Sequence, residues 1–235
     1  MKYMGSKNRI AKEILPIILK ERNQRTWVEP FVGGANLIDK VQGKRIGADI
    51  NHYLIDALIA IRDCICDLPK NNREFTEEDY KLLRKNDDYK YKGYAGFAFS
   101  YSGKWLGGWC RDGLNKRDYV NEAYKNALNQ SESLKGIRFV NESYNKLQIP
   151  DNSLIYCDPP YEGTTSYKDG FNHADFWQWC RDKTTEGHIV YISEYNAPND
   201  FKCIWSKEIV SSLTQDTGSK KAIEKLFTYT GAKSS

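Results

Sequence analysis

The sequence predicts an α/β fold in which one mostly parallel sheet is interrupted by an inserted segment. The first 65 residues alternate a short apolar strand, a glycine-rich turn, a helical stretch and a second strand, which is the order of a parallel β-α-β unit. This order stops near residue 65 and resumes at Ile137. With 235 residues, 40% of them hydrophobic, the chain is long enough to bury one sizeable core.

The individual elements follow from apolar periodicity and from the positions of glycine and proline. The predicted strands are Trp27–Glu29, Lys44–Asp49, Ile137–Val140, Ser153–Cys157, His188–Ser193, Cys203–Leu213 and Ile223–Thr230. The predicted helices are Lys7–Arg22 with a kink at Pro16, one starting near Asn36, His52–Cys64 and Ala174–Asp182. Residues 71–88 are polar and partly helical, and residues 89–124 are rich in rings, glycines and basic side chains.

Composition excludes several classes of protein. The mean hydropathy is −0.69 and no apolar run approaches the ~18 residues that span a bilayer, which excludes a transmembrane protein. Met1–Arg9 is polar and lacks a signal-peptide core, so we expect a protein that stays in the cytoplasm, where it is made. The six cysteines and three histidines lack the spacing of metal ligands, so we expect reduced thiols and no metal.

The sharpest local signal is Asp158-Pro159-Pro160-Tyr161, which directly follows the apolar strand at 153–157. Two prolines end a strand and stiffen the loop at its carboxyl end, where ligands bind in open α/β sheets. The motif presents a carboxylate, a backbone carbonyl and a ring. These groups suit a planar base with an exocyclic amine, because they can accept its two N–H protons and stack on its face. A proline-rich turn with a capping aspartate is the structural alternative.

A second signal is the stretch from Glu29 to Asn36, which contains Gly33 and Gly34 and is followed by Asp49. Glycines after a first strand let the backbone approach a ligand, and an acidic residue that ends the next strand can hydrogen-bond ribose hydroxyls. The absence of G-x-G-x-x-G disfavours a dinucleotide cofactor. Two weaker signals, each also compatible with solvated polar residues, are Lys2-Tyr3-Met4-Gly5-Ser6-Lys7 and Asn141-Glu142-Ser143-Tyr144.

Taken together, these motifs resemble the alpha group of DNA adenine-N6 methyltransferases, in which the cofactor motif precedes the target recognition region and D-P-P-Y follows it. The matching stretches are Y-M-G-S-K, E-P-F-V-G-G-A, A-D-I-N, E-S-Y, Y-C-D-P-P-Y and a C-terminal E-K-L-F. Ala35 departs from the many relatives that carry a second glycine at this position. The resemblance implies a Rossmann-like S-adenosylmethionine-dependent methyltransferase sheet over residues 1–62 and 132–235. It also implies an inserted, mostly helical target recognition domain with a hairpin over residues 63–131.

The resemblance further implies that S-adenosylmethionine is the cofactor. Tyr3 and Lys7 match positions at its methionine end, Asp49 matches a ribose ligand, and Ser143 and Tyr144 match positions that border its adenine. The cofactor-binding residues implied in this way are Tyr3, Met4, Lys7, Phe31, Gly33, Gly34, Asp49, Ile50, Ser143, Tyr144 and Asp158.

The implied catalytic residues are Asp158, Pro159, Pro160 and Tyr161. A side-chain oxygen of Asp158 and the carbonyl of Pro159 would accept both N6 protons, which directs the nitrogen lone pair toward the sulfonium methyl for in-line displacement. Tyr161 would stack on a flipped adenine, a contact worth about 1–3 kcal/mol. This helps to repay the few kcal/mol that flipping costs. Such a reaction requires no metal.

The inserted segment is expected to handle double-stranded DNA. Residues 85–130 contain ten aromatic, eight basic and five acidic residues, so this stretch carries a net charge of +3 within a chain of net charge +4. Rings interleaved with basic residues suit phosphate contacts and intercalation. The stretch Phe97–Arg111 resembles the DNA-reading hairpin of the family, and Arg111 is predicted to contact a base edge in the major groove. The predicted DNA-binding residues are Tyr101, Lys104, Trp105, Trp109 and Arg111. A small aromatic core with a solvated rim is the alternative.

Other functions stay open on the sequence alone. They are methylation of adenine in RNA or of another planar amine, a catalytically silent DNA-binding relative and, less compatible with the loop, a nicotinamide oxidoreductase. The sequence leaves open which DNA site is recognised, whether a cognate restriction enzyme exists, and the oligomeric state.

Overall fold

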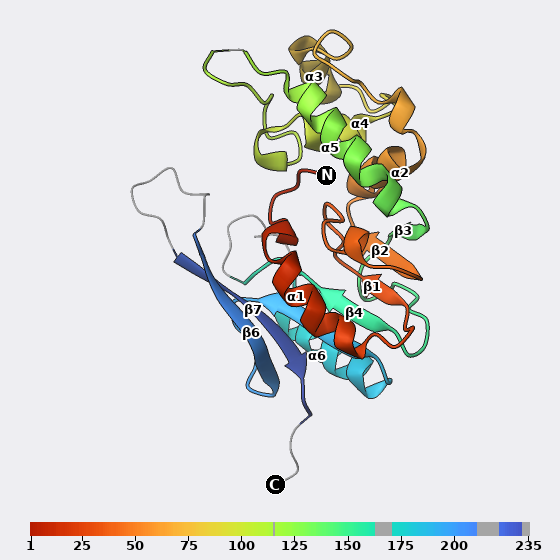
Figure 1. Cartoon of the computed structure of the whole chain (residues 1–235), viewed down its shortest axis with the longest axis vertical. Coiled ribbons are helices and arrows are strands. Elements are labelled where there is room, and N and C mark those ends of the chain that lie inside the picture. The colour runs from red at the N-terminus through yellow and green to blue at the C-terminus, as the bar shows by residue number, and fades with distance from the viewer. Residues whose placement is uncertain (115, 163–170, 211–220, 232–235) are drawn as a thin grey trace.

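The computed structural model, which describes residues 1–114, 116–162, 171–210 and 221–231, contains a seven-stranded sheet with helices on both faces (Figure 1). The strand order is β3-β2-β1-β4-β5-β7-β6. The first five strands in this order are parallel, and β7 runs antiparallel to both of its neighbours. The predicted α/β class and its mostly parallel sheet are confirmed.

All seven predicted strands are present. Their bounds are β1 Trp27–Glu29, β2 Arg45–Asp49, β3 Ile137–Asn141, β4 Leu154–Cys157, β5 Ile189–Glu194, β6 Phe201–Val210 and β7 Lys221–Tyr229. The predicted end of the sixth strand, residues 211–213, lies outside the described residues. Short apolar runs that are stopped by proline, glycine or asparagine explain why sequence periodicity located these strands within one or two residues.

Successive strand residues point to opposite faces and so build two separate cores. Trp27 and Tyr156 stack with ring centroids 6.2 Å apart on the face covered by α1 and α2. Val28 and Ile155 pack on the other face, against α6. The sheet is therefore the middle of three layers, which fixes the carboxyl ends of β1 and β4 rigidly at one edge.

The helices begin at side-chain caps in several places. The α-helices are α1 Ala11–Ile18, α2 His52–Asp63, α3 Glu77–Leu83, α4 Lys92–Ala98, α5 Tyr119–Leu134 and α6 His173–Thr185. The 3-10 turns are η1 Lys7–Arg9, η2 Leu19–Glu21, η3 Ile38–Lys40, η4 Ile65–Asp67 and η5 Tyr101–Gly103. Asn51 caps α2, Thr76 and Asp79 form a capping box on α3, and Asn172 caps α6. Pro16 lies inside α1, which continues as η2 after Ile18.

The helix predicted to start near Asn36 is wrong. The chain forms only the single 3-10 turn η3 before β2 begins at Arg45. Gly33 and Ala35 both adopt positive φ, +50° and +55°, so the loop doubles back where a helix would need negative φ. The turn η3 then ends at Val41, which is already extended with φ −98° and ψ 138°, so no regular helix forms.

The inserted segment packs onto the sheet domain at one end of the long axis (Figure 1). Its aromatic residues, among them Phe75 and Phe97, belong to the same apolar cluster as Ile14 of α1 and Leu58 of α2. The two parts thus share one continuous core, and the predicted boundary at 131/132 falls inside α5. Within the described residues, no helix is both long enough and apolar enough to cross a bilayer.

Candidate active site

The candidate site lies where β1 and β4 end, at the centre of the sheet. From these neighbouring strands the sheet extends to β2 and β3 on one side and to β5 on the other. In open α/β sheets, ligands bind at the carboxyl ends of the strands beside such a reversal of strand order. Glu29-Pro30-Phe31 follows β1, and Asp158-Pro159-Pro160-Tyr161 follows β4, so two of the sequence motifs meet at this point.

A buried lysine joins the N-terminal segment to the D-P-P-Y loop. Lys7 opens the turn η1, and its Nζ lies 3.1 Å from Oδ1 of Asp158 and 3.5 Å from Oε2 of Glu224. The Lys7 side chain is only 10% exposed and that of Glu224 only 8%. Two carboxylates therefore share one ammonium group with little access to water. Sequence reasoning singled out Lys7 and Asp158 but missed Glu224, although the E-K-L-F stretch that contains it was the available signal.

Burial changes the proton affinity of these groups. It raises the pKa of Asp158 from 3.8 to about 6, while the Lys7 ammonium lowers this pKa and the Glu224 carboxylate raises it. Burial lowers the pKa of Lys7, but the carboxylates of Asp158 and Glu224 together outweigh burial, so the pKa of Lys7 lies above its ordinary value of 10.5. At pH 7, Asp158 is a carboxylate whose charge is costly, and Lys7 is an ammonium.

The Tyr161 ring is held from three sides. Its hydroxyl donates a 2.7 Å hydrogen bond to Oε2 of Glu224. The Lys7 Nζ lies 4.4 Å from the ring centroid, and the Tyr195 ring packs edge-on with a centroid separation of 4.6 Å. These contacts fix the plane of a ring that the sequence predicted to stack on a substrate base.

The loop that carries these groups is also tied to the end of β5. Glu194 accepts hydrogen bonds from the backbone N–H of Glu162 at 3.2 Å and of Tyr195 at 2.7 Å. Burial raises the pKa of Glu194 from 4.5 to about 7, and the two backbone N–H groups lower it. Pro159 is buried at the centre of this loop and Pro160 is partly exposed. The proline pair and Glu194 together keep the backbone beside Asp158 in one conformation.

The glycine loop packs directly against Tyr3. A Cβ on Gly33 would lie 3.0 Å from Cε1 of Tyr3, and one on Gly34 would lie 2.7 Å from its Cβ. Gly33 also has a φ of +50°, which side chains other than glycine rarely adopt. The loop thus needs glycine both for its turn and for the close approach of Tyr3. Met4, the next residue along, is partly exposed.

Asp49 connects the end of β2 to the glycine loop. Its Oδ2 accepts from the N–H of Gly33 at 3.4 Å and its Oδ1 from the N–H of Asn51 at 3.0 Å. Burial raises the pKa of Asp49 from 3.8 to about 6, although these backbone N–H groups lower it. The adjacent residue Ile50 is 76% exposed. The Asp49 carboxylate and the exposed apolar residue Ile50 are therefore neighbours at the carboxyl end of β2.

The loop after β3 completes this edge. Tyr144 contacts Phe31 with ring centroids 5.4 Å apart, and Trp179 packs against Tyr144 at 90°. Ser143 donates its N–H to Glu142 and its hydroxyl to Asn145. The structure therefore brings Phe31, Tyr144 and Asp49 to the carboxyl ends of adjacent strands, as the motifs predicted.

In the inserted segment, a single antiparallel β-bridge between Ser100 and Trp109 closes a hairpin-like loop inside the predicted stretch Phe97–Arg111, without forming regular strands. The N–H of Tyr101 donates to the carbonyl of Gly108, and the N–H of Cys110 donates to that of Phe99, each at 2.9 Å. Tyr101, Lys104 and Arg111 are exposed. Arg111 donates to Oε1 of Glu77 at 2.7 Å, which holds its guanidinium at the rim of the hairpin.

The two predicted tryptophans instead pack into the aromatic core. Trp105 stacks on Tyr53 at 4.3 Å and 19°, and Trp109 contacts Phe75, Phe99 and Tyr80. Both are only partly exposed. Both tryptophans mainly pack against other rings in this structure. A contact between DNA and the exposed edge of either ring stays a prediction.

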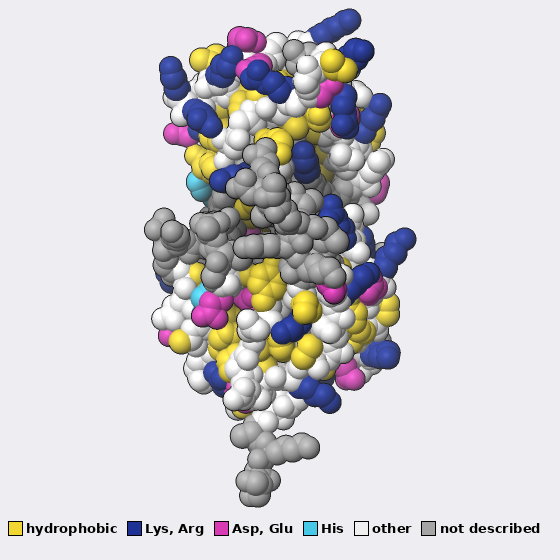
Figure 2. Space-filling view, turned by 90° about the vertical axis from the view of Figure 1, so that its left-hand side faces the viewer, with side chains coloured by type: hydrophobic (Ala, Val, Ile, Leu, Met, Phe, Trp, Pro, Cys, Tyr) yellow, Lys and Arg dark blue, Asp and Glu magenta, His cyan; other side chains and the backbone are white. Residues whose placement is uncertain are grey.

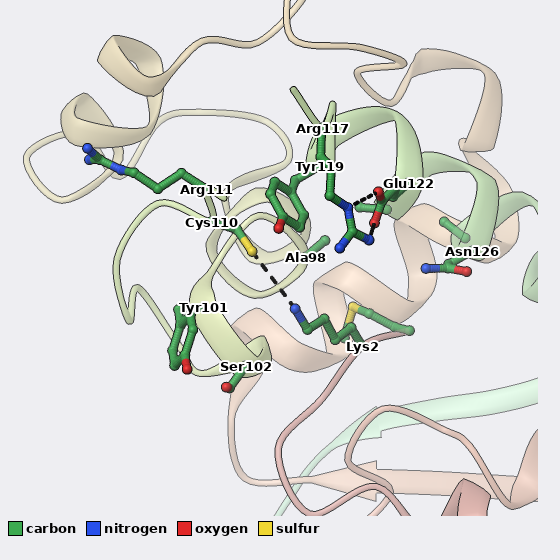
Figure 3. A pocket seen from close by; sticks show the side chains of 13 residues that line it. Lys2, Ala98, Tyr101, Ser102, Cys110, Arg111, Arg117, Tyr119, Glu122 and Asn126 are labelled. Atoms are coloured by element: carbon green, nitrogen blue, oxygen red, sulfur yellow. Dashed lines mark hydrogen bonds and ion pairs between the residues drawn. The ribbon is translucent and has the colours of Figure 1, made fainter. Parts of the chain in front are cut away.

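A cavity of about 370 Å³ lies between the N-terminal residues, the hairpin and α5 (Figure 3). Its lining includes Lys2, Tyr101, Cys110, Arg111, Arg117 and Tyr119. Arg117 forms two 2.8 Å hydrogen bonds with Glu122, and Nζ of Lys2 lies 4.0 Å from Sγ of Cys110. Sequence reasoning missed Lys2, Arg117 and Tyr119 as members of this surface, because they converge only in the fold.

Basic side chains are spread over the upper part of one face of the molecule, over the inserted segment, with hydrophobic side chains between them (Figure 2). This distribution agrees with the charge count of residues 85–130.

The fold and the site together define an α/β domain that carries a D-P-P-Y loop, a glycine loop and an acidic residue, Asp49, at the carboxyl ends of neighbouring parallel strands. The chain belongs to the D12 class N6 adenine-specific DNA methyltransferase family, whose model matches residues 3–212. The family predicted from the motifs is thereby confirmed.

Two curated relatives are Type II methyltransferases. The chain is 27% identical over 215 residues to M.FokI of Planomicrobium okeanokoites, and the match covers 77% of this chain but 31% of that protein. It is 29% identical over 221 residues to M.MjaIII of Methanocaldococcus jannaschii, with coverage of 75% and 74%. The crystal structure of SMU.472, a putative methyltransferase complexed with SAH, aligns with a TM-score of 0.35 and 9% identity, covering 97% of this chain and 54% of that one.

Proposed function

We propose that this chain transfers a methyl group from S-adenosylmethionine to N6 of a specific adenine in double-stranded DNA. The observation that carries the proposal is the position of Asp158, at the carboxyl end of β4, 3.1 Å from Lys7 and one strand away from the glycine loop after β1. A base amine and a methyl donor can both reach such a point. Because bacterial, archaeal and phage DNA lies in the cytoplasm, we expect the protein to act there.

The chemistry of the available groups fits S-adenosylmethionine. Asp49 offers carboxylate oxygens for ribose hydroxyls, and Phe31 and Ile50 offer apolar surface for a purine. Lys7 is a cation suited to the methionine carboxylate, and Asp158 is an anion suited to its amino group. When bound, the cofactor supplies a methyl group already activated on a sulfonium.

The protein then contributes positioning and electrostatics. The Asp158 carboxylate and the Pro159 carbonyl are placed to accept hydrogen bonds from the N6 amine, which counters delocalisation of its lone pair into the purine ring. Tyr161 is placed to stack on the base. In this displacement the N6–carbon bond would form as the carbon–sulfur bond of the sulfonium breaks, the thioether S-adenosylhomocysteine would leave, and one N6 proton would pass to the Asp158 carboxylate or to water.

DNA recognition is proposed for the inserted segment. Tyr101, Lys104 and Arg111 are exposed on the hairpin, and the adjoining cavity adds Lys2 and Arg117. Exposed cations suit phosphates, and the Arg111 guanidinium suits a guanine edge if it exchanges Glu77 for DNA. Trp105 and Trp109 support this surface from beneath.

The test is incubation with radiolabelled S-adenosylmethionine and unmethylated DNA, followed by nucleoside analysis. Label is expected in N6-methyladenine, and its absence would refute the proposal. Label in RNA alone would favour the RNA methyltransferase alternative. Asp158→Ala is expected to abolish transfer. Arg111→Ala is expected to relax or weaken site choice while cofactor binding is kept, and loss of cofactor binding would contradict its assignment to DNA.

A further inference from the structure

Glu224 is a buried acidic residue that reaches the candidate active site from a distant part of the chain. It lies on β7, the antiparallel strand between β5 and β6, opposite Lys207 in the register. Only 6% of the residue is exposed. It also lies beyond residue 212, where the match to the family model ends.

One carboxylate oxygen of Glu224 serves two partners. Oε2 accepts the hydrogen bond of the Tyr161 hydroxyl at 2.7 Å and lies 3.5 Å from Nζ of Lys7. Hydrogen bonds to a charged acceptor in a buried site are stronger than neutral ones. The N-terminal segment and the D-P-P-Y loop are therefore joined through β7.

The two carboxylates around Lys7 can have different roles. If Glu224 were absent, Asp158 would be the only carboxylate in contact with the Lys7 ammonium among the described residues, and the Tyr161 hydroxyl would lose a charged acceptor. A carboxylate occupied by a lysine is less available to a substrate amine. Asp158 is itself engaged in this structure, by Lys7 at 3.1 Å and by a hydrogen bond from the Tyr161 hydroxyl. A second carboxylate on the same ammonium and hydroxyl can keep both groups in place when Asp158 turns to the substrate.

We propose that Glu224 is a positioning residue that holds Lys7 and Tyr161 so that the Asp158 carboxylate can take the target amine. This inference rests on the proposed methyltransferase function. Glu224 itself needs no contact with substrate or cofactor, because it acts through its two partners.

The charge of Glu224 also acts on Asp158 from across the site. The titratable groups around Asp158 come from every adjoining element and are Lys7, Glu29, Tyr156, Tyr161, Glu194, Tyr195 and Glu224. Among them Glu224 raises the pKa of Asp158 and Lys7 lowers it. Removing the Glu224 charge alone should therefore lower the pKa of Asp158, an effect that a purely structural residue would not produce.

The experiment compares Glu224→Gln and Glu224→Ala with the wild-type protein in two measurements. The first is kcat on unmethylated DNA in assays run between pH 5 and 8. The second is the affinity for S-adenosylmethionine, measured by calorimetry. Glu224→Gln keeps the shape and a hydrogen-bond acceptor for Tyr161 but loses the charge. It is expected to lower kcat by about tenfold and to move the acid limb of the pH profile to lower pH. Glu224→Ala removes both functions and should lose roughly 100-fold in kcat.

Glu208→Gln is the matched control, because Glu208 is an exposed carboxylate on β6 opposite Ile223 in the register. It should behave as wild type. Thermal unfolding of each variant shows whether it is folded, and the isosteric Glu224→Gln decides the question if Glu224→Ala does not fold. A folded Glu224→Gln with wild-type kcat, or with a reduced kcat and an unmoved acid limb, would overturn the inference. Wild-type protein that neither binds the cofactor nor methylates DNA would overturn the proposed function, and this inference with it.

Discussion

Replacing Asp158 with asparagine is expected to abolish methyl transfer and, at the same time, to stabilise the folded chain at neutral pH. Burial raises the pKa of Asp158 from 3.8 to about 6, even with Lys7 beside it. In the unfolded chain the carboxyl returns to its ordinary pKa. At about 1.4 kcal/mol per pKa unit, the charged carboxylate costs the folded state about 3 kcal/mol at pH 7. Asparagine has a similar shape and no charge, so it removes this cost.

The pH dependence of the difference follows from the raised pKa. Between pH 6 and pH 4, the folded chain binds more protons at Asp158 than the unfolded chain does. The contribution of Asp158 to wild-type stability is therefore fully present below its unfolded pKa and is lost as the pH rises through its folded pKa. The asparagine variant lacks this dependence. Its advantage should be largest at pH 7 and above, and it should disappear toward pH 4.

Urea unfolding followed by circular dichroism at several pH values measures this advantage. At neutral pH the free energy of unfolding of Asp158→Asn should exceed that of wild type by about 1–3 kcal/mol. Each kcal/mol corresponds to an increase in Tm of roughly 2–4 °C for a chain of this length. Glu208→Gln, which removes an exposed carboxylate, should show no such gain. A less stable asparagine variant at pH 7, or a difference that is the same at every pH, would refute the reasoning that Asp158 is held charged at a cost.

Three further predictions address other parts of the molecule. The kcat of the wild-type enzyme should fall about tenfold per pH unit below the Asp158 pKa of about 6, because a protonated Asp158 is a poorer hydrogen-bond acceptor for the N6 amine. A kcat that stays constant from pH 7 to pH 5 would contradict this prediction. Asp49→Ala should raise the Kd of S-adenosylmethionine about 10–100-fold by calorimetry through loss of a charged hydrogen-bond acceptor, and an unchanged Kd would remove Asp49 from the cofactor site. Gly93→Ala should lower the free energy of unfolding by about 1–3 kcal/mol, because the new Cβ would lie 2.1 Å from the Tyr53 carbonyl oxygen, where α4 packs against α2. Gly113→Ala is the control. Its Cβ would have no atom within 4 Å, so it should leave stability unchanged in the same urea unfolding assay.

Local sequence signals predicted the sheet and which motifs lie at the carboxyl ends of its strands. Strands such as Trp27–Glu29 and Leu154–Cys157 are short apolar runs bounded by turn residues, so their existence and ends follow from nearby chemistry alone. Because parallel strands present their carboxyl ends at one edge, the motifs after those strands were correctly expected to meet. The failed helix near Asn36 had a local cause too, the positive φ of Ala35, which an alanine does not reveal.

Contacts between distant segments account for what the sequence did not predict. Glu224 reaches Lys7 only because β7 is inserted antiparallel beside β5, and no local pattern encodes that neighbour. Likewise, composition cannot distinguish an aromatic side chain that is exposed for contact with DNA from one that packs on another aromatic side chain. Trp105 packs because Gly96 leaves room for it, since a Cβ there would lie 2.3 Å from the indole.

The charge balance of the site supports the proposed chemistry independently of the motifs. Asp158 and Glu224 surround one buried cation, Lys7, which leaves one negative charge in excess when both acids are ionised. Glu194, whose pKa is raised to about 7, is partly ionised at neutral pH and adds to this excess. Glu29, also buried nearby, adds none, since burial raises its pKa well above the ordinary value although the Trp27 N–H donates to it. A poorly solvated negative excess favours a ligand of net positive charge, such as a sulfonium amino acid. It also favours a transition state in which positive charge develops on an amine nitrogen. An anionic phosphoryl donor would be repelled, so the site electrostatics favour a cationic donor over an anionic one.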